Sequence, residues 1–153
     1  MSNAGVEKVE WVNLGLMDYQ SCLEEQRRLH HRVVAGEPGK VIFVQHPATL
    51  TLGKNSSAEY FLRTRHQYRE LGIAVVETER GGEVTAHEPG QLVVYPILPL
   101  GRYQLTPKRY VQILEQAVIA TLAHYGVKAA TDPEYPGVWV GKNKICAVGV
   151  RIK

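Results

Sequence analysis

Stretches of periodic and continuous apolar residues divide the chain into helix-like and strand-like segments. Apolar residues at three- and four-residue spacing predict one helix over residues 18–34 and another that begins after Thr106 and ends before Gly126. Thr106 is a plausible N-cap and Pro107 suits the first helical position. A shorter helix is expected over residues 58–71. The short apolar runs, which predict strands, cover residues 9–14, 41–44, 49–52, 73–76, 92–95, 137–140 and 144–152.

This mixture predicts an α+β protein in which strands outnumber helices. The length of 153 residues indicates a single domain over residues 1–153, because one core suffices at that size. The last apolar run ends one residue before the end of the sequence. A strand ended in this way usually needs a further segment to pair with or cover it. The domain is therefore expected to be incomplete at its C-terminus.

Composition and charge exclude several classes of function. The chain is 44% hydrophobic and 22% charged with a net charge of +3, as in ordinary globular proteins. No secretory signal or membrane-spanning run is found, and two distant cysteines favour neither a disulfide scaffold nor a zinc cluster, so a cytoplasmic location without membrane contact is expected. Basic patches at residues 27–32 and 63–66 lack the interleaved aromatic residues of nucleic-acid binders. A solvated surface is the favoured interpretation, with an acidic protein partner as the alternative.

One long polar segment, RGGEVTAHEPGQ at residues 80–91, lies between two predicted strands. Two turns in a meander would explain its glycines and proline, but not its arginine, threonine and histidine. Glycines let backbone N–H groups approach a ligand closely. Alternation would place Glu83, Thr85 and His87 on one face and Val84 and Ala86 on the other. The segment could therefore line a pocket, and it lacks the spacing of a phosphate loop.

Together with its neighbours, this segment resembles the signature of the lipoyl(octanoyl) transferases. Residues 45–47 (QHP) with 51–53 (TLG) are similar to that family's early motif, and residues 137–140 (GVWV) with 144–149 (KICAVG) to its later ones. The resemblance implies a mixed, mainly antiparallel sheet with packed helices, an architecture shared with biotin and lipoate ligases. It also implies an acyltransferase of lipoate biosynthesis that needs no cofactor. Such enzymes move an octanoyl group from octanoyl-acyl carrier protein to a lysine of lipoyl domains of 2-oxoacid dehydrogenases or of glycine cleavage H protein, through an acyl-cysteine intermediate.

The resemblance also assigns roles to residues. Lys144 corresponds to the catalytic lysine, whose ammonium lowers the pKa of a cysteine thiol; taken alone, it would be a solvated lysine of a hairpin. We further hypothesise that the Gly149 N–H binds the substrate carbonyl. The residues expected to line the acyl and pantetheine site are Arg80, Gly81, Gly82, Glu83, Val84, Thr85, Ala86, His87, Ala147, Val148 and Gly149.

Three departures from the family pattern affect this prediction. Ala86 replaces the usual tyrosine, which should widen the acyl slot, and Glu88 replaces a glycine and could raise the pKa of His87. The family's Pro-Cys-Gly motif is expected beyond Lys153, so this chain by itself is expected to be inactive. Cys146 lies in an apolar run and is predicted to be an inert small hydrophobe, as is Cys22.

Two alternatives remain open from the sequence. A relative of the lipoate- or biotin-protein ligases would form an acyl-adenylate and require ATP. A catalytically inactive module would bind a carrier protein or lipoyl domain without a covalent intermediate. An unrelated scaffold role is disfavoured, because three motifs match in order.

Overall fold

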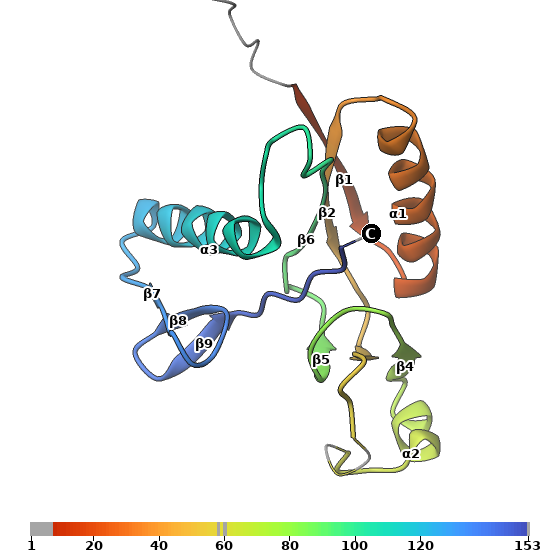
Figure 1. Cartoon of the computed structure of the whole chain (residues 1–153). Coiled ribbons are helices and arrows are strands. Elements are labelled where there is room, and N and C mark those ends of the chain that lie inside the picture. The colour runs from red at the N-terminus through yellow and green to blue at the C-terminus, as the bar shows by residue number, and fades with distance from the viewer. Residues whose placement is uncertain (1–7, 58, 60, 153) are drawn as a thin grey trace, which may run out of the picture. The chain divides into compact units, whose positions relative to one another are not determined.

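The computed structural model of the chain describes residues 8–57, 59 and 61–152. It comprises two compact units, Met1–Pro99 and Leu100–Lys153, which are described separately below (Figure 1).

The first sheet of unit 1 is built around a parallel crossover. Strand β1 (Val9–Leu16) leads through helix α1 (Tyr19–Val34) to strand β2 (Gly39–Gln45), which pairs parallel to β1. Strand β6 (Val93–Ile97) pairs antiparallel on the other side of β2, which gives the order β1-β2-β6. Figure 1 shows α1 alongside β1 and β2.

Helix α1 begins where the sequence provides a cap. The side chain of Asp18 accepts a hydrogen bond from the Ser21 N–H, which satisfies a backbone donor of the first turn. The helix packs an apolar stripe onto the first sheet. The core residues of this contact are Cys22, Leu29, Ile42 and Val44.

The second sheet of unit 1 repeats the same plan with shorter elements. Strand β3 (Thr49–Leu52) leads through helix α2 (Arg65–Glu70) to strand β4 (Ala74–Glu77), which is parallel to β3. Strand β5 (Val84–His87) pairs antiparallel on the other side, so the order is β4-β3-β5. β3 is therefore the central strand and β5 an edge strand.

Unit 2 contains one long helix and a small antiparallel sheet. Helix α3 (Pro107–His124) starts at the N-cap Thr106, as predicted. Strands β7 (Ala130–Thr131), β8 (Val138–Val140) and β9 (Asn143–Cys146) follow in the order β7-β8-β9. The buried carboxylate of Glu115 accepts a hydrogen bond of 2.9 Å from the Gly137 N–H, which ties the helix to the start of β8.

The α+β class predicted from the sequence is confirmed. Among the described residues, four strand pairs are antiparallel and two are parallel, so the sheets are mixed and mainly antiparallel. The predicted strands at residues 9–14, 41–44 and 49–52 and the long helices are present. That the chain is one domain, incomplete at its C-terminus, stays a prediction.

Two predicted elements are wrong in extent. The helix expected over residues 58–71 begins only at Arg65, because Thr64 and Gln67 form a capping box that fixes the first turn there. Residues 58 and 60 of that prediction lie outside the described residues. The strand expected over residues 144–152 ends at Cys146, because its partner β8 offers only three residues for pairing.

The loop after β3 approaches residues 80–83 so closely that it excludes a side chain at Gly53. The Gly53 N–H donates to the Glu83 carbonyl at 2.7 Å, and the Asn55 N–H donates to the Gly82 carbonyl at 3.1 Å. A Cβ at Gly53 would clash with the Gly82 carbonyl oxygen and lie 2.8 Å from that of Glu83.

Replacement of Gly53 with alanine should therefore destabilise the fold. We expect Gly53→Ala to lower the free energy of unfolding by about 1–3 kcal/mol, because backbone atoms must shift to admit the methyl group. Gly101→Ala is the matched control, since a Cβ there meets no atom within 4 Å, and it should change stability by less than about 0.5 kcal/mol. Urea unfolding measures both values, and equal stability of the two variants would contradict the prediction.

Candidate functional site

The polar segment at residues 80–91 forms strand β5 with a turn on each side. Gly82 and Gly90 adopt positive φ angles of 84° and 91°, which residues other than glycine rarely adopt. The segment therefore contains the two turns expected of a meander. Between them lies a strand that carries the polar residues Thr85 and His87.

The face of the second sheet that carries these side chains is polar and buried. Thr49 lies opposite His87, and Thr51 lies opposite Thr85, so the four side chains share one face. Thr49 and Thr51 are 3% and 0% exposed and His87 is 9% exposed. Burial of hydroxyl and imidazole groups costs free energy unless they are hydrogen-bonded. Because buried polar and titratable groups gather at functional sites, we take this face as the candidate site.

Hydrogen bonds fix the orientation of the His87 ring. The Gln91 Nε2 donates to the Ala86 carbonyl at 3.1 Å, which turns its Oε1 toward the His87 Nδ1 at 2.8 Å. His87 Nδ1 therefore carries a proton, and Nε2 lies 3.3 Å from the Thr51 hydroxyl, which also donates to the Thr85 carbonyl at 3.3 Å. The imidazole is thus held in orientation from both sides.

Arg80 contributes a half-buried positive charge next to this imidazole. Its Nη2 donates to the Thr51 carbonyl at 2.6 Å and to the Thr51 hydroxyl at 3.0 Å, and its Nη1 donates to the Gly81 carbonyl at 3.0 Å. The ion pairs in the described part of the chain do not include Arg80. Its charge is therefore positioned by neutral acceptors and is suited to attract a polar or anionic ligand oxygen.

A second polar cluster lies against the first. The His46 Nδ1 donates to the Met17 carbonyl at 2.7 Å, and its Nε2 is hydrogen-bonded with the Tyr95 hydroxyl at 3.0 Å. The ring centroids of His46 and His87 are 5.5 Å apart, and Tyr19 stacks 6.0 Å from His87. The two histidines, two tyrosines and Arg80 thus form one continuous polar site within unit 1.

Burial determines the charge states in this site. It raises the pKa values of Tyr95 and Tyr19, so both phenols stay protonated. Burial also lowers the pKa of His87, and the positive charge of Arg80 adds to this effect. The prediction that Glu88 raises the pKa of His87 is wrong: Glu88 is exposed, and desolvation of the imidazole dominates.

The predicted site residues of unit 2 lie on and beyond β9. Lys144, Ala147 and Gly149 are exposed and Val148 is half-buried. The Lys144 ammonium lies 4.8 Å from the centroid of the Trp139 ring. Burial and the nearby carboxylate of Glu115 raise the pKa of the Cys146 thiol, and burial raises that of Cys22. These environments make both thiols poor nucleophiles, as the sequence predicted.

Several members of the site were not predicted as site residues. His46 and Thr51 belong to the QHP and TLG motifs noted in the sequence, so a signal for them existed. Gln91 closes the quoted polar segment. The sequence carried no signal for Tyr19 and Tyr95, because an apolar stripe and an apolar strand account for them equally well.

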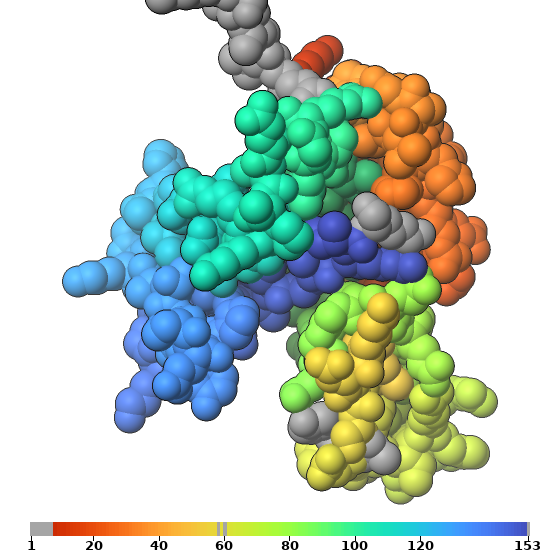
Figure 2. Space-filling model, viewed as in Figure 1, coloured from red at the N-terminus to blue at the C-terminus, as the bar shows by residue number. Residues whose placement is uncertain are grey.

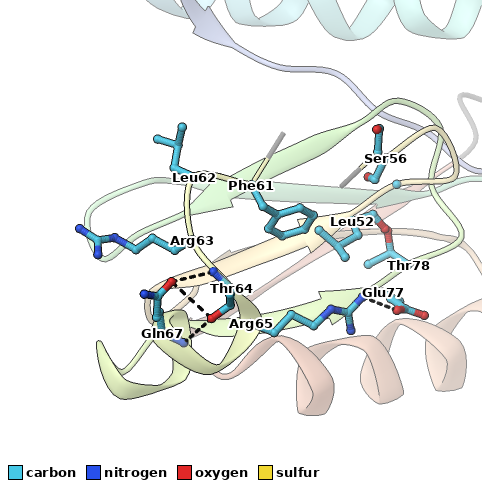
Figure 3. A pocket seen from close by; sticks show the side chains of 12 residues that line it. Leu52, Ser56, Phe61, Leu62, Arg63, Thr64, Arg65, Gln67, Glu77 and Thr78 are labelled. Carbon is cyan, nitrogen blue, oxygen red and sulfur yellow. Dashed lines mark hydrogen bonds and ion pairs between the residues drawn. The ribbon is translucent and has the colours of Figure 1, made fainter. Parts of the chain in front are cut away.

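A separate cavity of about 740 Å³ lies beside the loop that follows β3 (Figure 3). In both Figure 1 and Figure 2 this yellow loop lies side by side with yellow-green α2. Arg65 reaches across to Glu77 at 2.6 Å, and Leu52 and Phe61 supply apolar wall. The residues that line this cavity do not include 80–87, so it is distinct from the candidate site.

Some of the arginines in the basic patches seen in the sequence are paired with carboxylates. Arg28 contacts Glu25 at 2.6 Å and Arg32 contacts Glu37 at 2.6 Å, both on or next to α1. In the second patch Arg65 pairs with Glu77. This pairing reduces the positive charge that these three arginines offer to an acidic partner, and the choice between the two interpretations stays a prediction.

The described residues contain neither a metal-binding cluster nor a membrane-spanning helix. No group of three or more histidine, cysteine, aspartate or glutamate residues is placed to hold a metal ion there. Within the same part of the chain, none of the helices has the length and apolarity required to cross a membrane.

Comparison with solved structures defines the fold class. The crystal structure of a lipoate-protein ligase A bound with ATP superposes with a TM-score of 0.69 at 16% identity, over 90% of this chain and 58% of that one. The fold is therefore that of the lipoate-protein ligases.

Sequence comparison then gives the family. The profile of the lipoyl protein ligase A/B catalytic domain matches residues 18–153. Proteins named octanoyltransferase from Syntrophobacter fumaroxidans and Solibacter usitatus are 41% and 44% identical over 148 and 140 residues, which are 96% and 91% of this chain. The chain belongs to the lipoyl protein ligase A/B catalytic domain family. It spans 65% and 64% of the length of these two relatives.

The lowered pKa of His87 predicts a specific pH dependence of stability. Below the ordinary histidine pKa of 6.5, the unfolded chain binds a proton that the folded site resists. The free energy of unfolding should therefore fall between about pH 7 and pH 5, by about 1.4 kcal/mol per unit of pKa lowering. His87→Gln should flatten this fall, whereas His66→Gln, which leaves the buried imidazole in place, should retain it. Urea unfolding across this range tests the prediction; an unchanged slope in His87→Gln would refute it.

The raised thiol pKa values predict slow alkylation. Iodoacetamide should modify Cys146 and Cys22 in the folded protein at least about tenfold more slowly than the same cysteines in urea, because little thiolate forms and access is limited. Cys22, at 0% exposure, should be the slower of the two. Peptide mass spectrometry over time measures both rates. Rapid modification of Cys146 in the folded protein would show an activated thiol instead.

Proposed function

We propose that the protein transfers an octanoyl group from acyl carrier protein to a lysine of a lipoyl domain, in the cytoplasm, as a step of lipoate biosynthesis. The observation that carries this proposal is the 41% identity, along 96% of the chain, with a relative named octanoyltransferase. The acceptors would be lipoyl domains of 2-oxoacid dehydrogenases and glycine cleavage H protein. The polar site around Arg80 and His87 supports the proposal because it combines a fixed cation with a neutral, oriented imidazole.

The proposed reaction has two acyl-transfer steps. A cysteine thiolate attacks the carbonyl carbon of the octanoyl thioester, a new carbon–sulfur bond forms, and the carrier sulfur leaves and takes up a proton. The neutral amine of the acceptor lysine then attacks this intermediate, so that an amide forms, the cysteine sulfur departs and the amine loses a proton. Neither step is an oxidation or a reduction, and neither consumes ATP.

We assign the site residues to these steps as follows. Lys144 holds a positive charge that stabilises the attacking thiolate and thereby lowers its pKa. Residues 80–87, Ala147, Val148 and Gly149 are assigned to binding of the acyl and pantetheine groups. Gly149 has no side chain, so its N–H is accessible to the carbonyl oxygen of the acyl group. Ala86, in place of a larger residue, gives the acyl chain more room. The nucleophile is neither Cys146 nor Cys22.

The test uses the protein that carries this chain, octanoyl-acyl carrier protein and an unmodified lipoyl domain. Mass spectrometry of the lipoyl domain should detect one added octanoyl group in the absence of ATP. Transfer that requires ATP and free octanoate or lipoate would instead support a ligase. Binding of the lipoyl domain without any transfer would support an inactive binding module.

A matched pair of lysine variants tests the role of Lys144. We expect Lys144→Ala to lower the rate of octanoyl transfer by about 10²-fold or more, because the thiolate loses its stabilising charge. Lys142 lies two residues away on the same hairpin and is also exposed, so Lys142→Ala should transfer at close to the original rate. Equal rates in the two variants would remove Lys144 from the mechanism.

A further inference from the structure

Lys144 is held against its own hairpin although its side chain is exposed. Its ammonium lies 4.8 Å from the centroid of the Trp139 ring, within the range of a cation–π contact. Trp139 and Lys144 are directly opposed in the β8–β9 ladder, so their side chains leave the sheet on the same face. Among the residues that the structure describes, no carboxylate forms an ion pair with Lys144. The ring therefore determines where the charge sits.

The aliphatic part of Lys144 lies over Gly137. A Cβ at this glycine would be 3.4 Å from both Cδ and Cε of Lys144, and 2.5 Å from the Cys146 carbonyl oxygen. Gly137 has a φ of 129°, and its N–H is fixed by the hydrogen bond to Glu115. The absence of a side chain at this position thus leaves space for the lysine stem.

Trp139 is itself held in place. Its indole Nε1–H donates to the Tyr135 carbonyl at 3.1 Å. The Tyr135 ring packs against it edge-on, with centroids 6.4 Å apart. The surface that receives Lys144 is therefore preformed, so the flexible side chain is restrained before any substrate binds.

We infer that Gly137 and Trp139 form a lysine seat and that Trp139 is a positioning residue for Lys144. The inference rests on the proposed function of Lys144. Its consequence is that removal of the ring should weaken octanoyl transfer only through Lys144. Nothing in the seat needs to touch the substrate.

The first test does not depend on activity. Wild type, Trp139→Phe and Trp139→Leu are labelled with limiting acetic anhydride at one alkaline pH, and mass spectrometry compares Lys144 with Lys142. Loss of the ring should raise the labelling rate of Lys144 about threefold in Trp139→Leu and less in Trp139→Phe, with Lys142 unchanged. Equal labelling of Lys144 in all three proteins would refute the inference that Trp139 positions Lys144. This result would hold even if octanoyl transfer were never observed.

The second test is a double-mutant cycle on octanoyl transfer. Trp139→Leu should slow transfer about three- to tenfold, and Trp139→Phe should restore most of the rate. In the Lys144→Ala background, Trp139→Leu should cause no further loss. The same loss in both backgrounds would show a general structural role for Trp139 and overturn the inference. Absence of transfer in the wild type would refute the proposed function, while the labelling result would still decide on the seat.

Discussion

The arrangement of unit 1 depends on the need to hydrogen-bond the polar groups on the buried face of its second sheet. Thr51 lies at the centre of this requirement, because its hydroxyl interacts with both Arg80 and His87. A buried polar group left without a partner costs about 1–3 kcal/mol, so replacement of a single member of the network lowers the stability of the fold. The conformation of the polar segment is thus determined by specific partners rather than by apolar packing.

A second, steric constraint acts on the same segment from the residue that follows β3. Gly53 follows β3 directly and allows the backbone of residues 80–83 to approach it. Thr51 fixes the side chains of the segment and Gly53 fixes its backbone, although the two lie only two residues apart. One short stretch of β3 and its following loop therefore orients groups that come about thirty residues later, through two independent physical effects.

Sequence reasoning succeeded where the determining interactions are local. Asp18 and Thr106 cap the two long helices, and each helix is long enough for a clear periodicity. It failed at the start of α2, although the Thr64–Gln67 capping box that sets it is local, and it failed where a distant partner decides the outcome. The length of β9 is limited by β8, and the involvement of Tyr19 and Tyr95 follows from packing between distant segments. For the site, motif resemblance predicted residues 80–87, whereas the lowered pKa of His87 follows from its burial in the fold.

The position of β5 at the edge of its sheet has a consequence for motion. In the described part of the chain β5 pairs with β3 alone, so its strand hydrogen bonds can open while the pairing of β3 with β4 persists, whereas the buried contacts of His87 oppose full detachment. Local openings of this kind need less free energy than global unfolding and appear as faster amide hydrogen exchange. The backbone of β5 is thus expected to exchange its amide hydrogens faster than β3, while the His87 side chain stays in contact with Gln91 and Tyr19.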